Sequence, residues 1–133
     1  MTWVLTEIAD VQIQQSIPAL KFVLHSQGLT KFSLGLCLLD GDLISSMTLL
    51  ANNGRQKTIL KRADVSCLLI EGSIATLSLE KSDLDLLRVF SLKTVRDGTP
   101  EVDHLDLEVS AVLDGKAVRA DLMIRYPLVS SSE

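Results

Sequence analysis

The sequence has few aromatic residues and no excess of basic charge. Phe, Trp and Tyr together make up 4% of the 133 residues, and the formal net charge is −4. Nucleic-acid-binding domains usually carry a basic field, and many also offer aromatic rings on which bases stack. We therefore expect no nucleic-acid partner.

Long apolar runs are also missing. No stretch approaches the roughly 20 apolar residues that a membrane-spanning helix needs. The amino terminus, MTWVLTEIAD, lacks the basic segment of a signal peptide and contains two acidic residues. The two cysteines, Cys37 and Cys67, lie in apolar runs, where a free thiol packs as a small hydrophobic group. These features predict a cytoplasmic protein without membrane insertion.

The sequence contains none of the common catalytic motifs. Gly-x-Ser-x-Gly, the P-loop, Gly-x-Gly-x-x-Gly, His-Glu-x-x-His and Cys-x-x-Cys are all missing. There are only two histidines, and neither is close to a cysteine in the sequence. We predict a non-catalytic protein that uses no cofactor.

What is present is a chain suited to one folded domain. Hydrophobic residues make up 47% and charged residues 23%, a balance typical of globular proteins. The length fits a single domain over residues 1–133. Residues 129–133, VSSSE, are expected to be a flexible tail.

The clearest local pattern is a hairpin that turns at Asp114-Gly115. Asp-Gly favours a two-residue turn between antiparallel strands. Turning there brings together four apolar pairs on one face of the hairpin: Ala111 with Val118, Val109 with Ala120, Leu107 with Leu122, and Leu105 with Ile124. Since a shift of one residue would destroy this match, the pattern predicts the register as well.

Three further dipeptides mark turns at Asp40-Gly41, Asn53-Gly54 and Glu71-Gly72. Together they predict a meander of antiparallel strands, in which residues 32–38 pair with residues 43–49. Aligning the two Leu-Asp-Gly turns opposes their apolar positions, which argues against an internal repeat. Residues 16–28 and 82–95 fit either a helix or a strand.

The predicted fold is therefore mainly β. We expect an antiparallel sandwich, or a partly closed barrel, built from hairpins with seven to nine strands, and one amino-terminal helix as an option.

His104, Asp106 and Glu108 form a candidate metal site, because alternate strand residues share one face. The hairpin register offers a simpler explanation. It sets His104 opposite Arg125, and it places Asp106 and Glu108 diagonal to Arg125 and Arg119, as on a solvated sheet face. We therefore predict no metal there, although the register also opposes Glu108 and Asp121, a like-charged pair that a cation could bridge.

Four basic residues in RQKTILKR form a possible anion-contact patch: Arg55, Lys57, Lys61 and Arg62. A solvated strand, in which lysine discourages unwanted pairing with other chains, is the preferred interpretation.

Apolar doublets recur inside the expected strands: Leu38-Leu39, Leu49-Leu50, Ile59-Leu60, Leu68-Leu69-Ile70 and Leu86-Leu87. Neighbouring strand residues point to opposite faces, so doublets make both faces of a sheet apolar. The leading hypothesis is a protein-interaction or assembly module with a leucine-rich β-sheet surface, whose partner is another protein or a second copy. The alternatives are a β-barrel that binds a small lipid-like ligand and a metal-dependent site on the carboxyl-terminal hairpin.

Overall fold

The computed structural model describes residues 2–6, 9–14, 19–24, 26–51, 53–97, 104–113 and 116–125. These residues form two helices and nine strands in chain order: β1 (Thr2–Thr6), β2 (Ala9–Gln14), β3 (Ala19–Leu24), α1 (Ser26–Asp40), β4 (Ser46–Ala51), β5 (Gln56–Arg62), β6 (Cys67–Glu71), β7 (Ile74–Leu79), α2 (Lys81–Asp97), β8 (His104–Leu113) and β9 (Lys116–Arg125). The expected tail, residues 129–133, lies outside the described residues.

All nine strands belong to one sheet, in the order β1-β4-β5-β7-β6-β8-β9-β3-β2. Parallel and antiparallel pairings alternate across it. The hairpins β2–β3, β4–β5, β6–β7 and β8–β9 are antiparallel, whereas β1–β4, β5–β7, β6–β8 and β3–β9 are parallel. The prediction of hairpins is confirmed, but the prediction of an antiparallel meander is wrong, because the hairpins join each other through parallel strands.

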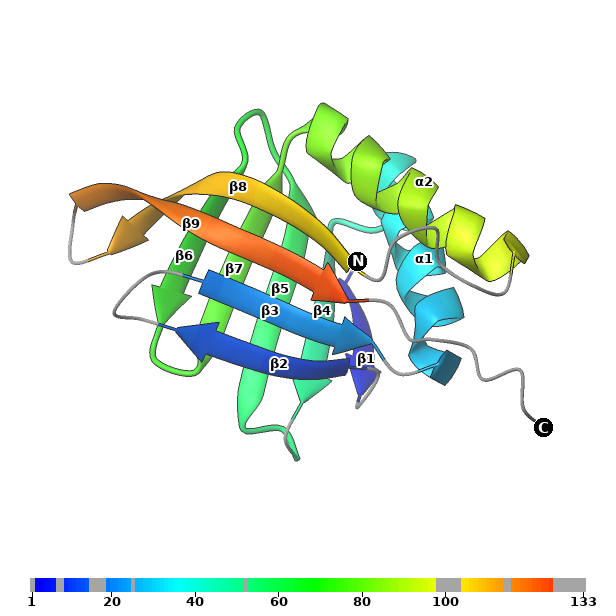
Figure 1. The fold of residues 1–133 in the computed structure, drawn as a ribbon, viewed down its shortest axis with the longest axis horizontal. Coiled ribbons are helices and arrows are strands. Elements are labelled where there is room, and N and C mark those ends of the chain that lie inside the picture. The colour runs from blue at the N-terminus through cyan, green and yellow to red at the C-terminus, as the bar shows by residue number, and fades with distance from the viewer. Residues whose placement is uncertain are drawn as a thin grey trace.

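The sheet bends back over itself. In Figure 1, β8, β9, β3 and β2 cross in front of β6, β7, β5 and β4, and the two helices lie at one end of the resulting fold. The edge strands β1 and β2 do not pair with each other in the described part of the chain. The fold is thus a curved mixed sheet with two helices, neither a closed barrel nor an all-β protein.

Helix α1 replaces the strand predicted over residues 32–38. Its buried apolar residues follow the helical spacing of three or four: Leu29, Phe32, Leu36 and Leu39. Asp40-Gly41 ends this helix instead of turning a hairpin. The Gly41 amide donates to the carbonyl oxygen of Cys37 at 3.0 Å, and Asp42 adopts the positive φ of 57°.

The two ambiguous segments resolve differently. Residues 19–24 form β3, between β2 and β9, and α1 begins only at Ser26. Residues 81–97 form α2. The option of a single amino-terminal helix is therefore corrected to two helices, both of them after β3.

The other turn and hairpin predictions hold. Asn53 and Gly54 have φ values of 59° and 80° between β4 and β5, and Gly72 has a φ of 61° between β6 and β7. Glycine and asparagine adopt such values at low cost. In β8–β9, all four predicted apolar pairs are register partners. The turn itself, Asp114-Gly115, lies outside the described residues.

The core lies inside the bend of the sheet. Its largest fully buried side chains come from α1 and five strands: Leu20, Leu24, Phe32, Leu36, Leu39, Met47, Leu49, Leu60, Leu68, Leu77 and Leu79. Helix α1 packs onto this inner side of the sheet. The approach at Gly35 is close, since a Cβ atom on this residue would collide with the Met47 sulfur and lie 3.2 Å from the Trp3 ring.

The order of elements repeats, contrary to the prediction from the turn alignment. A hairpin, a helix and a hairpin occur as β2–β3–α1–β4–β5 and again as β6–β7–α2–β8–β9. The first hairpin of each unit joins the second hairpin of the other through a parallel pair, β3–β9 and β5–β7. Both helices contain Phe-Ser-Leu, at 32–34 and 90–92, with the serine buried and the leucine exposed.

Candidate interaction surface

Five adjacent strands, β1-β4-β5-β7-β6, present a second side opposite to the core. Since strand residues alternate between faces, the neighbours of the buried residues Leu5, Met47, Leu49, Leu60 and Leu77 point away from the core. We call this side the outer face and define it by fifteen residues: Thr2, Val4, Thr6, Ser46, Thr48, Leu50, Lys57, Ile59, Lys61, Cys67, Leu69, Glu71, Ile74, Thr76 and Ser78.

An uncharged row crosses the middle of the outer face. Strand pairing sets Val4 beside Thr48, Thr48 beside Ile59, Ile59 beside Thr76, and Thr76 beside Leu69. Aliphatic and threonine side chains therefore alternate along a line perpendicular to the strands. Cross-strand pairs of β-branched and aliphatic residues stabilise the sheet itself, and here they leave a line of side chains without charge.

The apolar members of the outer face are open to solvent. Val4 is 52% exposed, Ile74 42% and Leu69 36%. Ile59 and Leu50 are half-buried among their neighbours. Both helices contact strands of this half of the sheet, and α1 does so from the core side, against Met47. Both faces of these five strands thus carry apolar residues, and the described residues fill the inner face, whereas Val4, Leu69 and Ile74 on the outer face stay exposed.

The apolar doublets of strands and those of helices have different outcomes. In Leu49-Leu50, Ile59-Leu60 and Leu68-Leu69, one residue enters the core and the other lies on the outer face. In α1 and α2, Leu39 and Leu87 are buried, while Leu38 is half-buried against the core and Leu86 is exposed. The strand doublets therefore mark the outer face as the sequence predicts, whereas the helical ones result from helix periodicity.

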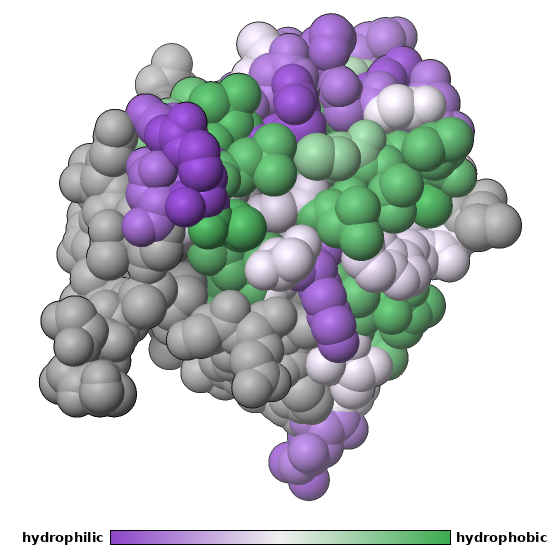
Figure 2. All heavy atoms as spheres, turned by 90° about the vertical axis from the view of Figure 1, so that its right-hand side faces the viewer, coloured by the Kyte–Doolittle hydropathy of each residue, from purple (hydrophilic) through white to green (hydrophobic). Residues whose placement is uncertain are grey.

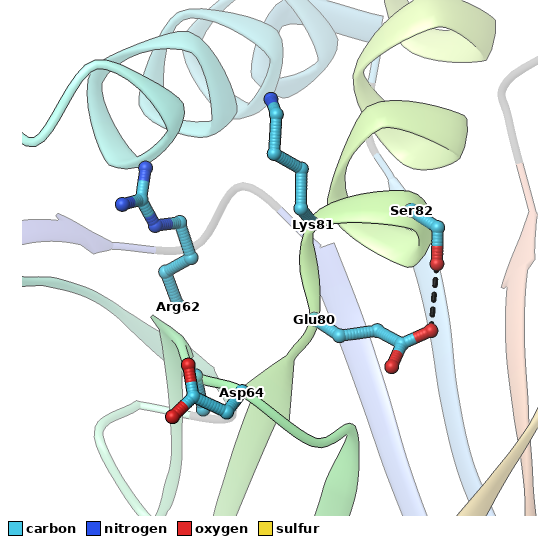
Figure 3. Close-up of a pocket in the computed structure, with 6 residues that line it drawn as sticks. Arg62, Asp64, Glu80, Lys81 and Ser82 are labelled. Carbon is cyan, nitrogen blue, oxygen red and sulfur yellow. Dashed lines mark hydrogen bonds between the residues drawn. The ribbon is translucent and has the colours of Figure 1, made fainter.

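A second feature is an open polar pocket of about 410 Å³, where β5 and β7 end and α2 begins. Figure 3 shows Arg62 and Lys81 both reaching toward the end of α1. Arg62 donates to the carbonyl oxygen of Asp40 at 2.7 Å and to the Asp42 carboxylate at 3.1 Å. Lys81 donates to Asp40 Oδ1 at 3.0 Å. Both cations of the pocket are therefore engaged by carboxyl or carbonyl oxygens, as in a structural ion-pair network.

Electrostatics follow from these contacts. The hydrogen bond from Lys81 lowers the pKa of Asp40 below its ordinary value; partial burial opposes this shift, and the charges of Lys81, Arg88 and Arg62 add to it. The same hydrogen bond raises the pKa of Lys81. Both shifts favour the charged pair, so the network stabilises the junction of α1 and α2 and offers no poised acid or base.

The amino-terminal end of α2 is tied to β6 by a buried serine. The Ser66 hydroxyl donates to the carboxylate of Asp83 and accepts a hydrogen bond of 2.9 Å from the Glu80 amide. These contacts satisfy polar groups at a helix start, which otherwise lack partners within the helix. Ser66 thus has a structural role beside the polar pocket.

The predicted anion-contact patch is divided between the two faces of β5. Lys57 and Lys61 lie on the outer face with Ile59 between them, whereas Arg62 lies on the opposite side and pairs with Asp42. Arg55 lies in the turn that precedes the strand. The four residues therefore do not converge on one point.

The candidate metal residues are register positions on β8. His104 is paired with Arg125 and Glu108 with Asp121, as the sequence predicts. The side chains of His104, Asp106 and Glu108 are outside the described part of the chain. Among the residues that the structure does describe, no three His, Cys, Asp or Glu side chains gather as metal ligands. Cys37 and Cys67 are both free.

An apolar groove of about 450 Å³ runs along α2, lined by Val89, Leu92, Lys93, Val95 and Arg96. Figure 2, which views the side of the molecule where the helices lie, shows several apolar patches separated by hydrophilic ones. Within the described ranges, neither helix is long and apolar enough to cross a membrane.

Sequence reasoning found the strand leucines but missed the threonines that complete the uncharged row. Thr48 and Thr76 lie on either side of Ile59, one on each strand next to β5. Their signal is only the alternation within each strand, and the parallel pairing of β5 with β7 is needed to align them.

Comparison with known proteins does not assign a family. No protein-family model matches the chain, and no curated protein is significantly similar to it. The function must therefore be argued from the geometry above.

Proposed function

We propose that this protein is a non-catalytic interaction module that binds another protein surface through the outer face. The observation that supports this most is the uncharged row from Val4 to Leu69, which crosses five strands without a charged side chain. Val4 and Leu69 at its two ends are exposed, Ile59 and Thr76 are half-buried, and Thr48 is buried between its neighbours. Apolar side chains exposed on one face in this way are typical of interaction sites.

The chemistry of the surface fits protein contact better than small-molecule binding. Its central row is made of aliphatic and threonine residues, and its charged residues, Lys57, Lys61 and Glu71, lie two positions along the strands from that row. Protein interfaces share this arrangement of an apolar centre depleted in charge and a polar rim.

The lipid-binding alternative gains less support from the packing. A lipid-like ligand would need an enclosed apolar space, and fully buried side chains such as Phe32, Leu36 and Met47 occupy the inside of the bend. The metal-dependent alternative would rely on the β8–β9 hairpin, where backbone pairing alone supports no ligand set.

The proposal is tested by photo-crosslinking in the cells that make the protein. A benzoylphenylalanine at Ile74 should form a covalent adduct with another protein chain. The matched control is the same substitution at Leu43, an apolar residue that is 68% exposed and follows the end of α1, where its amide donates to the carbonyl oxygen of Leu38. We expect an adduct from position 74 and none from position 43.

A charge within the uncharged row should then remove the adduct. Ile59→Lys should abolish crosslinking from position 74, whereas Leu43→Lys should leave it unchanged. Circular dichroism of each variant checks that the fold is retained. If position 74 forms no adduct, or if both lysine variants behave alike, the outer face is not an interaction surface.

A further inference from the structure

The few charges on the outer face are arranged around one strand. Among its fifteen residues only Lys57, Lys61 and Glu71 are charged, and all three are exposed. Lys57 is the register partner of Ile74 on one side of β7, and Glu71 is the partner of Ile74 on the other. Opposite charges therefore flank β7 symmetrically, each about 4.8 Å away in the strand-to-strand direction.

Opposite charges on the two sides of β7 allow the outer faces of two copies of the chain to bind each other. A two-fold interface brings the same patch of both subunits together, so that residue i contacts j and j contacts i. If the two-fold axis runs along β7 between two facing sheets, β5 of one copy lies over β6 of the other. Lys57 then faces Glu71 of the second copy, and the reciprocal contact forms as well.

The uncharged positions match under the same operation. Ile59 faces Leu69 of the second copy, and Ile74 and Thr76 face their own counterparts. Apolar residues therefore meet apolar ones, and the two Lys-Glu contacts lie at the sides of the contact. Two sheets that pack face to face keep their strands within about 30° of each other, so this correspondence holds near the axis.

Other axes in the plane of the sheet are less favourable. An axis along β5 would set each lysine against itself, and an axis along β6 would set Glu71 against Glu71. An axis perpendicular to the strands through the uncharged row would bring Lys57 over Lys61. Like charges in contact across an interface weaken association. Of these arrangements, only the axis along β7 pairs opposite charges.

None of the three charged side chains forms an ion pair with any residue that the structure describes. Lys57 and Glu71 are thus available for contacts outside the subunit. We infer that the partner of the outer face is a second copy of this chain, in a two-fold dimer whose axis runs along β7, with Lys57 contacting Glu71 across the interface. This inference rests on the function proposed above and specifies the partner.

The test exchanges charges across the interface. Lys57→Glu sets two glutamates against each other twice, and Glu71→Lys does the same with lysines. Each variant alone should dimerise at least about tenfold more weakly than the unmodified protein. An equimolar mixture of the two should recover the dimer. In the mixed pair, the glutamate introduced at position 57 meets the lysine introduced at position 71, and the unchanged Lys57 and Glu71 meet each other.

Sedimentation equilibrium measures the mass of each sample relative to the 14.5 kDa chain. Lys61→Glu is the matched control, since Lys61 lies on the same strand and face but faces Cys67 of the second copy. It should leave dimerisation close to that of the unmodified protein. Because all three positions are exposed, the variants should fold, which circular dichroism verifies.

Recovery of the dimer in the mixture, with neither variant dimeric alone, supports the inference. An unmodified protein that stays monomeric at high concentration overturns it, as does a mixture that stays monomeric or single variants that dimerise normally. If the unmodified protein is monomeric but Ile74 still crosslinks to a different protein, only the self-association fails and the proposed function stands.

Discussion

Gly35 on α1 lies against Met47 on β4, with no space between them for a methyl group. Gly35→Ala should therefore destabilise the protein, although alanine favours a helix by about 1 kcal/mol. Met47 is fully buried, so it cannot move into solvent. Overpacking of a core typically costs about 1–3 kcal/mol, and we expect a net loss in the free energy of unfolding, measured by urea denaturation.

The neighbouring residue provides the control for this variant. Leu34 is 51% exposed on the same helix, so Leu34→Ala should change the unfolding free energy by about 0.5 kcal/mol or less. A shorter side chain at Met47 should make room for the new methyl group. The double variant Gly35→Ala/Met47→Ala should then lose less than the sum of the two single losses; additive losses would contradict the close approach.

The ion pair between Asp40 and Lys81 should make the stability of the folded protein depend on pH in acidic solution. The pKa of Asp40 is lower in the folded protein than its ordinary value of 3.8. The ion pair therefore contributes stability above the unfolded pKa, and this contribution is lost as the pH falls through the lowered folded pKa. At pH 6, Asp40→Asn should cost about 1 kcal/mol or less, as usual for a partly exposed pair.

Thermal unfolding at several pH values measures this effect. The difference between the unmodified protein and Asp40→Asn should shrink from pH 6 to below pH 4, and it should also shrink in 0.5 M salt because of screening. A difference that grew in acid would mean that the Asp40 carboxylate does not stabilise the fold.

Replacing Ser66 should lower the stability of the protein more than the small size of this side chain indicates. Ser66→Ala removes one hydrogen bond to the Glu80 amide and one to the Asp83 carboxylate. Leaving such groups without a partner costs about 1–3 kcal/mol. We expect a fall in the melting temperature and faster hydrogen exchange in the first turn of α2.

Ser82 is the matched comparison, since it belongs to the same turn. Its hydroxyl donates to the Glu80 carboxylate at 2.6 Å but is exposed to water. Ser82→Ala should change stability by about 0.5 kcal/mol or less. Equal losses from the two serines would show that Ser66 does not hold the start of the helix.

Hairpins were predictable because their signals are local. In β8–β9, a turn dipeptide and four matched apolar pairs lie within some twenty residues, and the predicted register is the one observed. The existence of a second apolar sheet face was predictable, since the strand doublets indicated that both faces carry apolar residues. Its extent was not, because it depends on parallel pairs such as β5–β7, which no turn dipeptide marks.

The segment before Asp40-Gly41 was misread because two periods coincide there. Phe32, Leu34, Leu36 and Leu38 alternate as in a strand, while Leu29, Phe32, Leu36 and Leu39 follow a helix. Leu34 settles the question, because it is exposed whereas its strand-period neighbours Phe32 and Leu36 are buried. The Phe-Ser-Leu shared by the two helices was the signal for the repeat, and an alignment on the Asp-Gly turns could not find it.

The parallel pairing of β3 with β9 has a consequence for synthesis of the protein on the ribosome. Ala19 pairs with Asp121, so the first hairpin must wait for about 100 further residues before it gains its neighbour. At 5–20 residues per second, that delay is about 5–20 s. During this time β3 presents an unpaired edge, to which other nascent chains can add. Production of this protein should therefore benefit from slow expression and from chaperones that shield extended segments.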